Sequence, residues 1–435
     1  MIVDTEEELQ SVLEYIKDKK TLLVPIYADH LLHPAVNKIS CIYIYTEDGV
    51  ERLVPFYHTE QLRGFSDHLP TFLNLPGIFV HDKKNWLVSG GNPDCLDVKT
   101  LWWFTYNEPY DESHYPTIAH NFYWRRHTKL PNVNTIIPIM KHVEMCQKIR
   151  YYAWPMILNM KMDEPLYYYN NLFPRIFAEI EKAGISVNEK FPLPNLIFGG
   201  RVYSQYHYHT ATGRPSNAFG GFNYAAMNKE DGTRDSIGNR NGALVEMDFD
   251  AYHLRIIANI IGHKFPEGSV HKYLGQFYFG TDTLTTDQYE ESKKITFRLL
   301  YGGIDKEFLQ IPFFNEVNDK IWTLFKQWQK RGYIETPLGK RKITMENVEG
   351  VTANKLFNYY LQAAETEISG TLIHEAQKYL KDFKSEIVLY TYDSFLIDCS
   401  LSEVNIIIPE LERRLKYPVK IKYGNIYSKV RELVS

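Results

Sequence analysis

Two strand-like runs that lie far apart in the sequence each end in an aspartate. Ala243–Met247 is short and apolar and leads into Asp248, after which apolar residues recur at helical spacing. Glu386–Tyr392 leads into Asp393, and Phe395–Ile397 completes the pattern of a β-hairpin with an acid at its tip. Either acid alone is more simply interpreted as a turn residue that binds its own backbone. On adjacent strand ends, however, two like charges are costly unless cations bind them, and carboxylates that hold two Mg²⁺ ions suit phosphoryl transfer.

The composition is that of a globular protein of two or three domains. The 435 residues are 44% hydrophobic and 23% charged, and the net charge of −4 argues against a strongly basic nucleic-acid binder without excluding a basic cleft. No N-terminal signal pattern or long apolar run is present, so we expect no membrane partner. The cysteines are scattered without CxxC spacing, so we expect neither a disulfide framework nor a zinc site, and a cytoplasmic location. They are Cys41, Cys95, Cys146 and Cys399.

Three stretches differ in pattern and define three expected domains. Residues 1–130 alternate strand-like runs with helical ones. Residues 131–200 are predicted to be mostly helical, with a helix that ends at Gly184 as its C-cap. Residues 201–435 mix strands with long helices and contain every strong chemical pattern. The clearest strand-like runs of the first domain are Thr21–Ile26 and Ile39–Tyr45.

One segment of the third domain carries an aromatic stripe interrupted by a lysine. Tyr289, Lys293, Phe297 and Tyr301 recur every fourth residue, which places them along one face of a helix. An amphipathic helix that packs aromatic side chains into a core is the simpler interpretation of this spacing. The lysine favours the alternative, a helix face that binds an anion.

The order and content of these patterns resemble the A-family DNA polymerases. Residues 248–255, Asp-Phe-Asp-Ala-Tyr-His-Leu-Arg, look like motif A of that family, and residues 389–394, Leu-Tyr-Thr-Tyr-Asp-Ser, look like its motif C. The resemblance implies that Asp248 and Asp393 bind two Mg²⁺ ions, together with the main-chain carbonyl of Phe249.

The aromatic stripe resembles motif B of the same family. By that resemblance Lys293 binds the triphosphate, Phe297 packs against the incoming sugar and base, and Tyr301 lies at the insertion site. His271 resembles an element before this helix and would supply a further phosphate contact, although a lone histidine is as often structural. His253 stands where the family has a glutamate that crowds the ribose 2′ position opposite the motif B tyrosine, so we expect a preference for dNTPs.

Three short elements resemble the parts of the family that hold primer and template. A Thr-Gly-Arg-Pro-Ser segment implies that Arg214 reaches the minor groove, where base-edge acceptors are nearly independent of sequence. A Thr-Pro-Leu-Gly-Lys-Arg segment implies that Lys340 and Arg341 contact DNA phosphates, although a basic surface turn is the simpler interpretation. Asn358 and Gln362 match the family's Asn-x-Pro-x-Gln pair, a second reader of the minor groove.

The chain also departs from the family pattern. Tyr392 replaces a histidine of motif C, Ser394 replaces a glutamate, and Tyr289 stands where motif B has an arginine. Residues 172–188 resemble the helix that precedes the family's long thumb, but only about two dozen residues separate this segment from the Thr-Gly-Arg element. We therefore expect a rudimentary thumb.

The first domain faintly resembles the family's proofreading exonuclease. Laid on that domain, Ile26, Ala28 and Trp86 replace metal-binding acids, and Asp97 alone remains. A two-metal exonuclease cannot work without its carboxylates. We therefore expect a degenerate domain that is either a structural relic or a platform for DNA or a partner.

These patterns predict an α/β and α+β multidomain fold, in which a right-hand polymerase palm and fingers with a rudimentary thumb follow an N-terminal RNase-H-like, exonuclease-related domain. The predicted function is primer extension on a DNA template with dNTPs, by a phage enzyme in the host cytoplasm. An enzyme with so small a thumb is expected to need a processivity or replisome partner. The one clear basic run before the polymerase core, at 125–129, is more simply a solvated face, and contact with the emerging duplex is the alternative. The alternative is a catalytically weak, polymerase-derived scaffold that binds nucleic acid.

Overall fold

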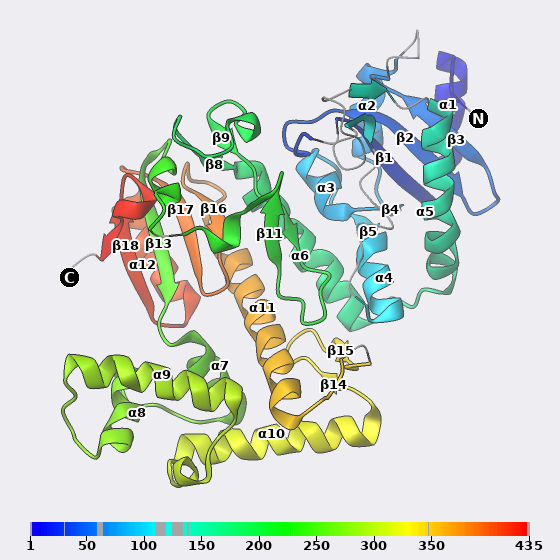
Figure 1. Cartoon of the computed structure of the whole chain (residues 1–435). Coiled ribbons are helices and arrows are strands. Elements are labelled where there is room, and N and C mark those ends of the chain that lie inside the picture. Colours follow the sequence, from blue (N-terminus) through cyan, green and yellow to red (C-terminus); the bar gives the residue numbers. More distant parts are fainter. Residues whose placement is uncertain are drawn as a thin grey trace.

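The computed structural model describes residues 2–29, 31–58, 64–108, 119–123, 134–136, 139–228, 230–346 and 348–432. The chain is organised around two separate large sheets, with a group of helices beyond the second (Figure 1). The basic run at 125–129 and the domain boundary expected at residue 130 lie outside the described residues.

The N-terminal sheet has the predicted RNase-H-like arrangement. Its strands follow the order β3-β2-β1-β4-β5, in which β1 (Thr21–Asp29) is antiparallel to β2 and parallel to β4, while β6 pairs with the far end of β1. Successive side chains of β1 face opposite sides, so Leu23 packs towards α1 and Leu22 packs towards α4 and α5. The other bounds are α1 (Glu6–Ile16), β2 (Ile39–Thr46), β3 (Glu51–Pro55), α2 (Leu69–Leu73), β4 (Ile78–Val80), α3 (Lys83–Val88), β5 (Cys95–Asp97), α4 (Val98–Tyr106), β6 (Ala119–Tyr123) and β7 (Asn134–Ile136).

The two helices expected to form a connector pack on different parts of the molecule. α5 (Ile139–Asn159) lies on the N-terminal sheet, where Val143 and Cys146 are buried. α6 (Glu164–Ala183) packs instead against α3, α11 and β16. α6 begins after the N-cap Asp163 and ends at Gly184, whose φ of +65° suits a glycine and confirms the predicted C-cap.

Only short elements separate α6 from the loop that carries Arg214. Residues 184–213 are all described, and they contain two-residue strands and one turn of 3-10 helix. No long helix occurs within this described segment, as expected for a rudimentary thumb. The strands are β8 (Ile185–Ser186), β9 (Arg201–Val202) and β10 (Tyr206–His207), and β11 (Ser216–Phe219) and β12 (Phe222–Asn223) follow.

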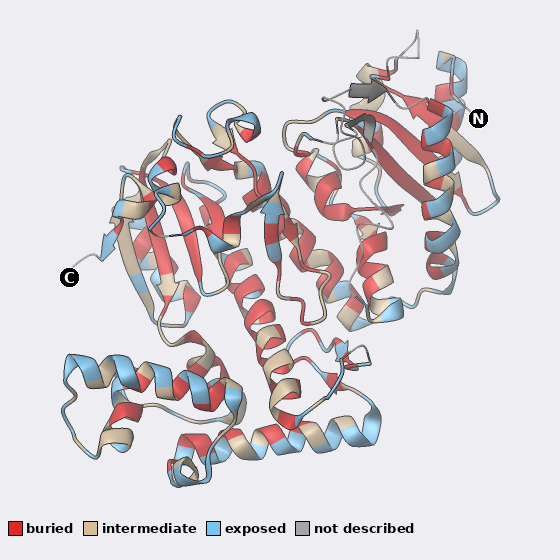
Figure 2. Ribbon diagram, viewed as in Figure 1, coloured by how far each residue is buried: buried red, intermediate tan, exposed pale blue. Residues whose placement is uncertain are grey.

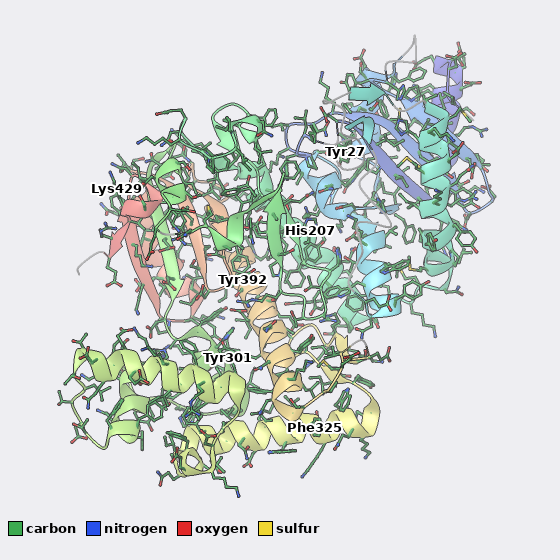
Figure 3. The ribbon with its side chains drawn as sticks, viewed as in Figure 1. Tyr27, His207, Tyr301, Phe325, Tyr392 and Lys429 are labelled. Carbon is green, nitrogen blue, oxygen red and sulfur yellow. The ribbon has the colours of Figure 1, made fainter. Side chains whose placement is uncertain are left out.

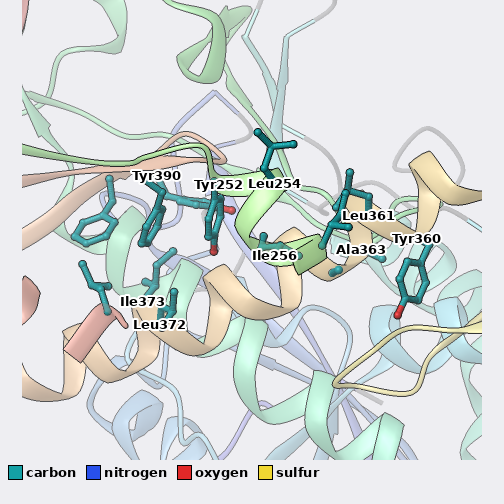
Figure 4. Close-up of a cluster of buried hydrophobic side chains, with 14 of the residues drawn as sticks. Tyr252, Leu254, Ile256, Tyr360, Leu361, Ala363, Leu372, Ile373 and Tyr390 are labelled. Atoms are coloured by element: carbon teal, nitrogen blue, oxygen red, sulfur yellow. The ribbon is translucent and has the colours of Figure 1, made fainter. Parts of the chain in front are cut away.

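The second sheet, the palm, is antiparallel throughout, in the order β16-β17-β13-β18-β19. Along its central strand β13 (Gly242–Phe249), Val245 and Met247 enter the main core with α7 and α11, and Figure 4 shows part of that core. The alternate residues Glu246 and Asp248 line a pocket on the opposite side. The other bounds are α7 (Tyr252–Ile261), β16 (Glu386–Tyr390), β17 (Ser394–Ser400), α12 (Val404–Leu415), β18 (Val419–Gly424) and β19 (Arg431–Glu432).

A body of helices lies beyond the palm, and α11 (Ala353–Leu380) runs from one to the other (Figure 1). α8 packs on α9, and α10 packs on α11. α9 (Thr286–Gly302) begins with a capping box formed by Thr285 and Gln288. Figure 2 shows that buried residues concentrate in the two sheets and along α6 and α11, whereas α9 and α10 keep exposed faces. The remaining bounds are α8 (Val270–Phe279), α10 (Pro312–Arg331), β14 (Ile334–Glu335) and β15 (Lys342–Ile343).

Candidate active site

The palm brings together Asp248, near the end of β13, and Asp393, in the turn between β16 and β17. Asp248 is paired with Ser394 across β13 and β17, and the amide of Phe249 donates to the carbonyl of Asp393 at 2.8 Å. Burial raises the pKa of Asp393, and the negative charge of Asp248 raises it further. The surrounding protein therefore leaves this carboxylate short of positive charge, which is the condition under which a bound cation is most stabilising.

The hairpin that presents Asp393 is tightly turned. Tyr392 adopts a φ of +63°, a left-handed conformation that is uncommon for a residue other than glycine. The amide of Asp393 donates to the carbonyl of Thr391 at 2.8 Å, and the hydroxyls of Thr391 and Ser394 lie 2.7 Å apart. Strained backbone of this kind is typical of functional sites. Ser394, which replaces the expected glutamate, thus uses its hydroxyl to hold the hairpin.

A third acid, Glu246, and a lysine, Lys422, share the pocket with the two aspartates, and the sequence analysis missed both. Lys422 Nζ lies 2.7 Å from Glu246 Oε2 and 3.0 Å from Asp248 Oδ2, and Tyr427 donates to Glu246 at 2.9 Å. Burial alone would lower the pKa of Lys422, but Glu246 and Asp248 outweigh it and raise the pKa. The signal for Glu246 was its position two residues before Asp248, on the same face of the strand.

The pocket offers carboxylate oxygens of the kind that Mg²⁺ prefers. Its volume is about 250 Å³, and Asp248 and Asp393 both line it. Within the described part of the chain no group of three or more His, Cys, Asp or Glu side chains is placed to hold a metal ion. The pair of aspartates therefore fits a site that is completed by substrate and water oxygens, which is usual for Mg²⁺ at phosphate chemistry. The expected contribution of the Phe249 carbonyl stays a prediction.

The stripe of Tyr289, Lys293, Phe297 and Tyr301 lies on α9 and is partly exposed. It therefore differs from the stripe of an amphipathic helix that packs its aromatic side chains into a core. The ring of Phe297 is 43% exposed and stacks on Tyr301, with centroids 6.1 Å apart and planes at 8°. Lys293 Nζ lies 4.3 Å from the centre of the Tyr289 ring and 2.8 Å from a Glu290 oxygen. Among the residues that the structure describes, the only anion paired with Lys293 is Glu290, an exposed neighbour on the same helix, and Lys293 could exchange this partner for a phosphate.

His271 lies beside this face but carries no charge near neutral pH. It is buried at the start of α8, and its ring centre is 5.6 Å from that of Phe297. Burial lowers the pKa of His271 to about 4. Its Nδ1 has no hydrogen-bond partner among the described residues. The residue could therefore donate or accept a hydrogen bond, but it would not supply the positive charge expected of a phosphate ligand.

The predicted sugar-side and primer-side residues share one buried acid that the sequence analysis missed. Glu365 of α11 lies 2.9 Å from His253 Nε2 and 3.2 Å from Arg214 Nε. His253 Nδ1 in turn contacts the hydroxyl of Tyr301, and the Arg214 guanidinium lies 3.8 Å from the centre of the Tyr392 ring. Figure 3 shows Tyr301 at the palm-facing end of the helical body and Tyr392 at the edge of the palm.

The other expected DNA contacts divide into exposed and buried residues. Lys340 is exposed, and its ammonium donates to the carbonyl of Pro337 at 2.7 Å. Arg341 differs from the expected surface cation, because it is 3% exposed. Its guanidinium donates to the carbonyl of Ala211 at 2.8 Å and lies 4.2 Å from the Trp103 ring centre, so in this structure it braces the loop that precedes Arg214.

Asn358 and Gln362 lie one turn apart on α11, as the spacing predicts. Asn358 donates to the main-chain carbonyl of Tyr301 at 3.1 Å, while its side-chain oxygen has no partner among the described residues. Asn358 thereby fixes the end of α9 against α11, and its oxygen remains available.

Of the three residues that stand at the expected metal positions of the N-terminal domain, two are apolar and fully buried, and the third, Ala28, is half-buried. Ile26 and Trp86 are fully buried in apolar clusters. Asp97 is also buried, where it caps α4 and accepts hydrogen bonds from the amide of Lys83 at 3.0 Å and the hydroxyl of Thr100 at 2.7 Å. Its oxygens are thus committed to holding the fold.

Comparisons with known proteins agree with this architecture. DNA polymerase I of Thermus thermophilus is 23% identical over 244 residues, and that of Lactococcus lactis subsp. lactis is 20% identical over 250 residues. These matches cover 48% and 49% of this chain but only 29% and 28% of the relatives, so the chain matches less than a third of their length. No family model matches the chain.

The fold is that of a known polymerase domain. The POL domain of Pol1 from M. smegmatis, solved in complex with DNA primer-template and dNTP, superposes with a TM-score of 0.67 at 15% identity. The superposition covers 98% of this chain and 99% of that domain. No helix among the described residues is long and apolar enough to cross a membrane.

Proposed function

We propose that this chain, a divergent relative of DNA polymerase I with the fold of a Pol1 polymerase domain, is a template-directed DNA polymerase that extends a primer 3′-OH with dNTPs. The observation that carries the proposal is the pair Asp248, near the end of β13, and Asp393, next to the start of β17, with too little positive charge around Asp393. The stripe of α9 supports the proposal, because burial raises the pKa of its last residue, Tyr301, and the Asp393 carboxylate lies near enough for its charge to raise that pKa further. The fold similarity supports it further.

The site residues then divide the work of a single step, in which the primer 3′-oxygen attacks the α-phosphorus and pyrophosphate leaves. Two Mg²⁺ ions, when bound by Asp248, Asp393 and the Phe249 carbonyl, would activate the attacking oxygen and stabilise the leaving group. Lys293 would attract the triphosphate. The exposed ring of Phe297 would pack against the incoming base and sugar.

The remaining residues would hold primer and template around that step. Arg214 and Gln362 would read minor-groove acceptors, which are common to all base pairs. Lys340 would contact phosphate from its exposed turn. Arg341 would act indirectly, because its contact with Ala211 fixes the loop that carries Arg214.

A catalytically weak scaffold that binds nucleic acid is the second candidate. Ser394 and Tyr289 favour it, because each replaces a charged residue of the family pattern. The short segment between α6 and Arg214 also favours it, since few elements are present there to grip a duplex.

Primer extension in the presence of Mg²⁺ separates the two candidates. The full chain should lengthen a labelled primer on a DNA template with dNTPs, and Asp248→Ala or Asp393→Ala should not. Tight primer-template binding without extension, at any concentration of Mg²⁺, would identify the scaffold instead.

We also propose that the enzyme acts with a processivity or replisome partner, in the cytoplasm, which would be that of the host for a phage-encoded chain. All four cysteines are free and buried, which fits a reducing compartment. Few duplex contacts mean weak, less salt-dependent binding, and a tether would raise the local concentration at the primer end. Extension with a trap for dissociated enzyme should give only short products, and products of hundreds of nucleotides would rule out the need for a partner.

A further inference from the structure

Glu365 occupies an unusual place for a charged side chain. It lies in the middle of α11, 2% exposed, within a run of buried residues. A carboxylate at such a position is stable only where cationic or hydrogen-bonding partners compensate for lost water. Its partners come from two distant segments, His253 on α7 and Arg214 on the loop before β11.

Each partner of Glu365 connects to a different part of the site. On one side, Glu365 lies beside His253 Nε2, and the other ring nitrogen, Nδ1, contacts the Tyr301 hydroxyl. On the other side, Arg214 lies over the ring of Tyr392, the residue beside Asp393. The Arg214 and His253 N–H groups do not point squarely at the carboxylate oxygens, so these are ion-pair contacts with room to adjust.

We propose that Glu365 is a positioning residue that ties the nucleotide side of the site, His253 and Tyr301, to the primer side, Arg214 and Tyr392. The inference rests on the proposed polymerase function and assigns to one buried carboxylate both the selection of deoxyribonucleotides and the response to a mispaired primer end. A primer end that displaces Arg214 removes positive charge from beside Glu365, so the pull of the carboxylate on His253 changes, and the contact of His253 with Tyr301 changes with it. No ion pair or hydrogen bond joins Arg214 to His253 directly among the described residues, so Glu365 is their shared link.

The charge of Glu365, rather than its volume, should carry this role. Glu365→Gln keeps the shape and removes the charge, whereas Glu365→Asp keeps the charge and shortens the side chain. In the full chain, Glu365→Gln should lower two ratios about tenfold each: kcat/KM for dATP over ATP, and extension of a matched over a mismatched primer. Glu365→Asp should retain more of both ratios than Glu365→Gln. The reverse order, or a change in only one ratio, would overturn the proposal.

Glu367→Gln is the matched control, since Glu367 is an equally buried acid two residues along the same helix. Its carboxylate accepts from the amide of Leu338 at 2.8 Å and contacts Tyr169, on a different side of α11. This variant should lower thermal stability and leave both selectivity ratios unchanged.

A double-mutant cycle tests the link independently of activity. The effects of Arg214→Ala and His253→Ala on the free energy of unfolding should be non-additive while Glu365 is present and additive in Glu365→Gln. Additive effects in the wild-type background would overturn the link, also for a protein that extends no primer. Failure of wild-type extension alone would instead count against the proposed function.

Discussion

The palm and the N-terminal domain both hold aspartates at the ends of strands, but they treat the charge in opposite ways. In the palm, burial and the neighbouring Asp248 raise the pKa of Asp393. In the N-terminal domain, burial would raise the pKa of Asp82, but Lys99 and Lys84 outweigh it and lower the pKa. The difference teaches that two nearby carboxylates are a candidate metal site only where the protein itself does not neutralise them.

The geometry of the partners supports this contrast. Lys99 Nζ lies 2.7 Å from Asp82 Oδ2, with both side chains almost fully buried. Lys422 is the nearest equivalent in the palm, but it contacts Asp248 rather than Asp393 and is shared with Glu246. One lysine thus serves two acids in the palm, and a net negative charge remains.

The largest effect should separate the two regions by activity. Asp248→Ala or Asp393→Ala should reduce primer extension by about a thousandfold or more, equivalent to about 4 kcal/mol of transition-state stabilisation. Asp97→Ala should leave extension per folded molecule unchanged, because Asp97 caps α4 in the other domain. Single-turnover extension with the folded fraction measured by circular dichroism provides the comparison. Near wild-type rates in either palm variant would show that the two acids do not bind catalytic metal ions.

The next effect should appear in folding. Asp82→Ala should destabilise the protein by about 3 kcal/mol, because it removes the buried carboxylate that lies 2.7 Å from Lys99 Nζ and also removes the N-cap of α3. The midpoint of urea unfolding measures the change, and Lys141→Ala, which removes one half of an exposed ion pair, is the control. An unchanged midpoint for Asp82→Ala would mean that the contact between Asp82 and Lys99 does not stabilise the fold.

A smaller effect should distinguish the two regions by pH. The folded pKa of Asp82 is lowered, so its stabilisation is present above the unfolded value, about 3.9, and is lost as the pH falls through the folded pKa. The folded pKa of Asp393 is raised, so its ionisation destabilises the fold at neutral pH, and this penalty disappears as the pH falls below about 3.9.

Asp393→Asn should therefore raise the melting temperature at neutral pH by roughly 1–2 °C and by less near pH 4. Without Mg²⁺ the variant should therefore melt at the higher temperature. With Mg²⁺ the wild-type protein should melt at the higher temperature, because the ion binds and stabilises its folded state. Thermal unfolding at both pH values, with and without Mg²⁺, measures the four cases. A wild-type melting temperature that is the same with and without Mg²⁺ would argue against a cation at Asp393.

For exonuclease activity of the N-terminal domain we expect no measurable effect. The purified protein should not shorten a mismatched primer, because Ile26 and Trp86 fill two expected ligand positions and Asp97 is fully hydrogen-bonded. A gel with a labelled mismatched primer and no dNTPs tests this. Shortening that disappears in Asp97→Asn would show that the N-terminal domain retains a nuclease site, and would end the contrast between the two regions.

The sequence patterns were sufficient for the elements that local periodicity determines. The apolar run before Asp248 became β13, the run before Asp393 became β16, and the four-residue spacing of Tyr289 to Tyr301 became α9. The second predicted strand ends at Tyr390 rather than at residue 392, because the hairpin needs Tyr392 in a left-handed conformation. The RNase-H-like sheet and the short thumb segment also followed the resemblance.

Partners of charged side chains could not be predicted in the same way. Arg341 and Lys340 are adjacent cations in one turn, yet only Arg341 is buried, because Trp103 and Ala211 from elsewhere in the chain receive it. Glu365 was not singled out from the sequence, and its contacts depend on two segments more than a hundred residues upstream. Tertiary packing determines such pairings, and the local periodicity of a sequence does not predict them.

Glu181 on α6 has a consequence for how this protein can evolve. Its buried carboxylate receives Lys84 at 2.7 Å, lies 3.4 Å from His33 and accepts from the amide of Tyr206 at 2.6 Å, so it joins the first domain to the palm side. Removal of Lys84, alone or together with the rest of the first domain, would leave the Glu181 carboxylate without its nearest cation. Loss of the first domain is therefore expected to destabilise the palm side of α6. Substitutions on the surface of the first domain should be tolerated more easily than substitutions at its buried contact with Glu181.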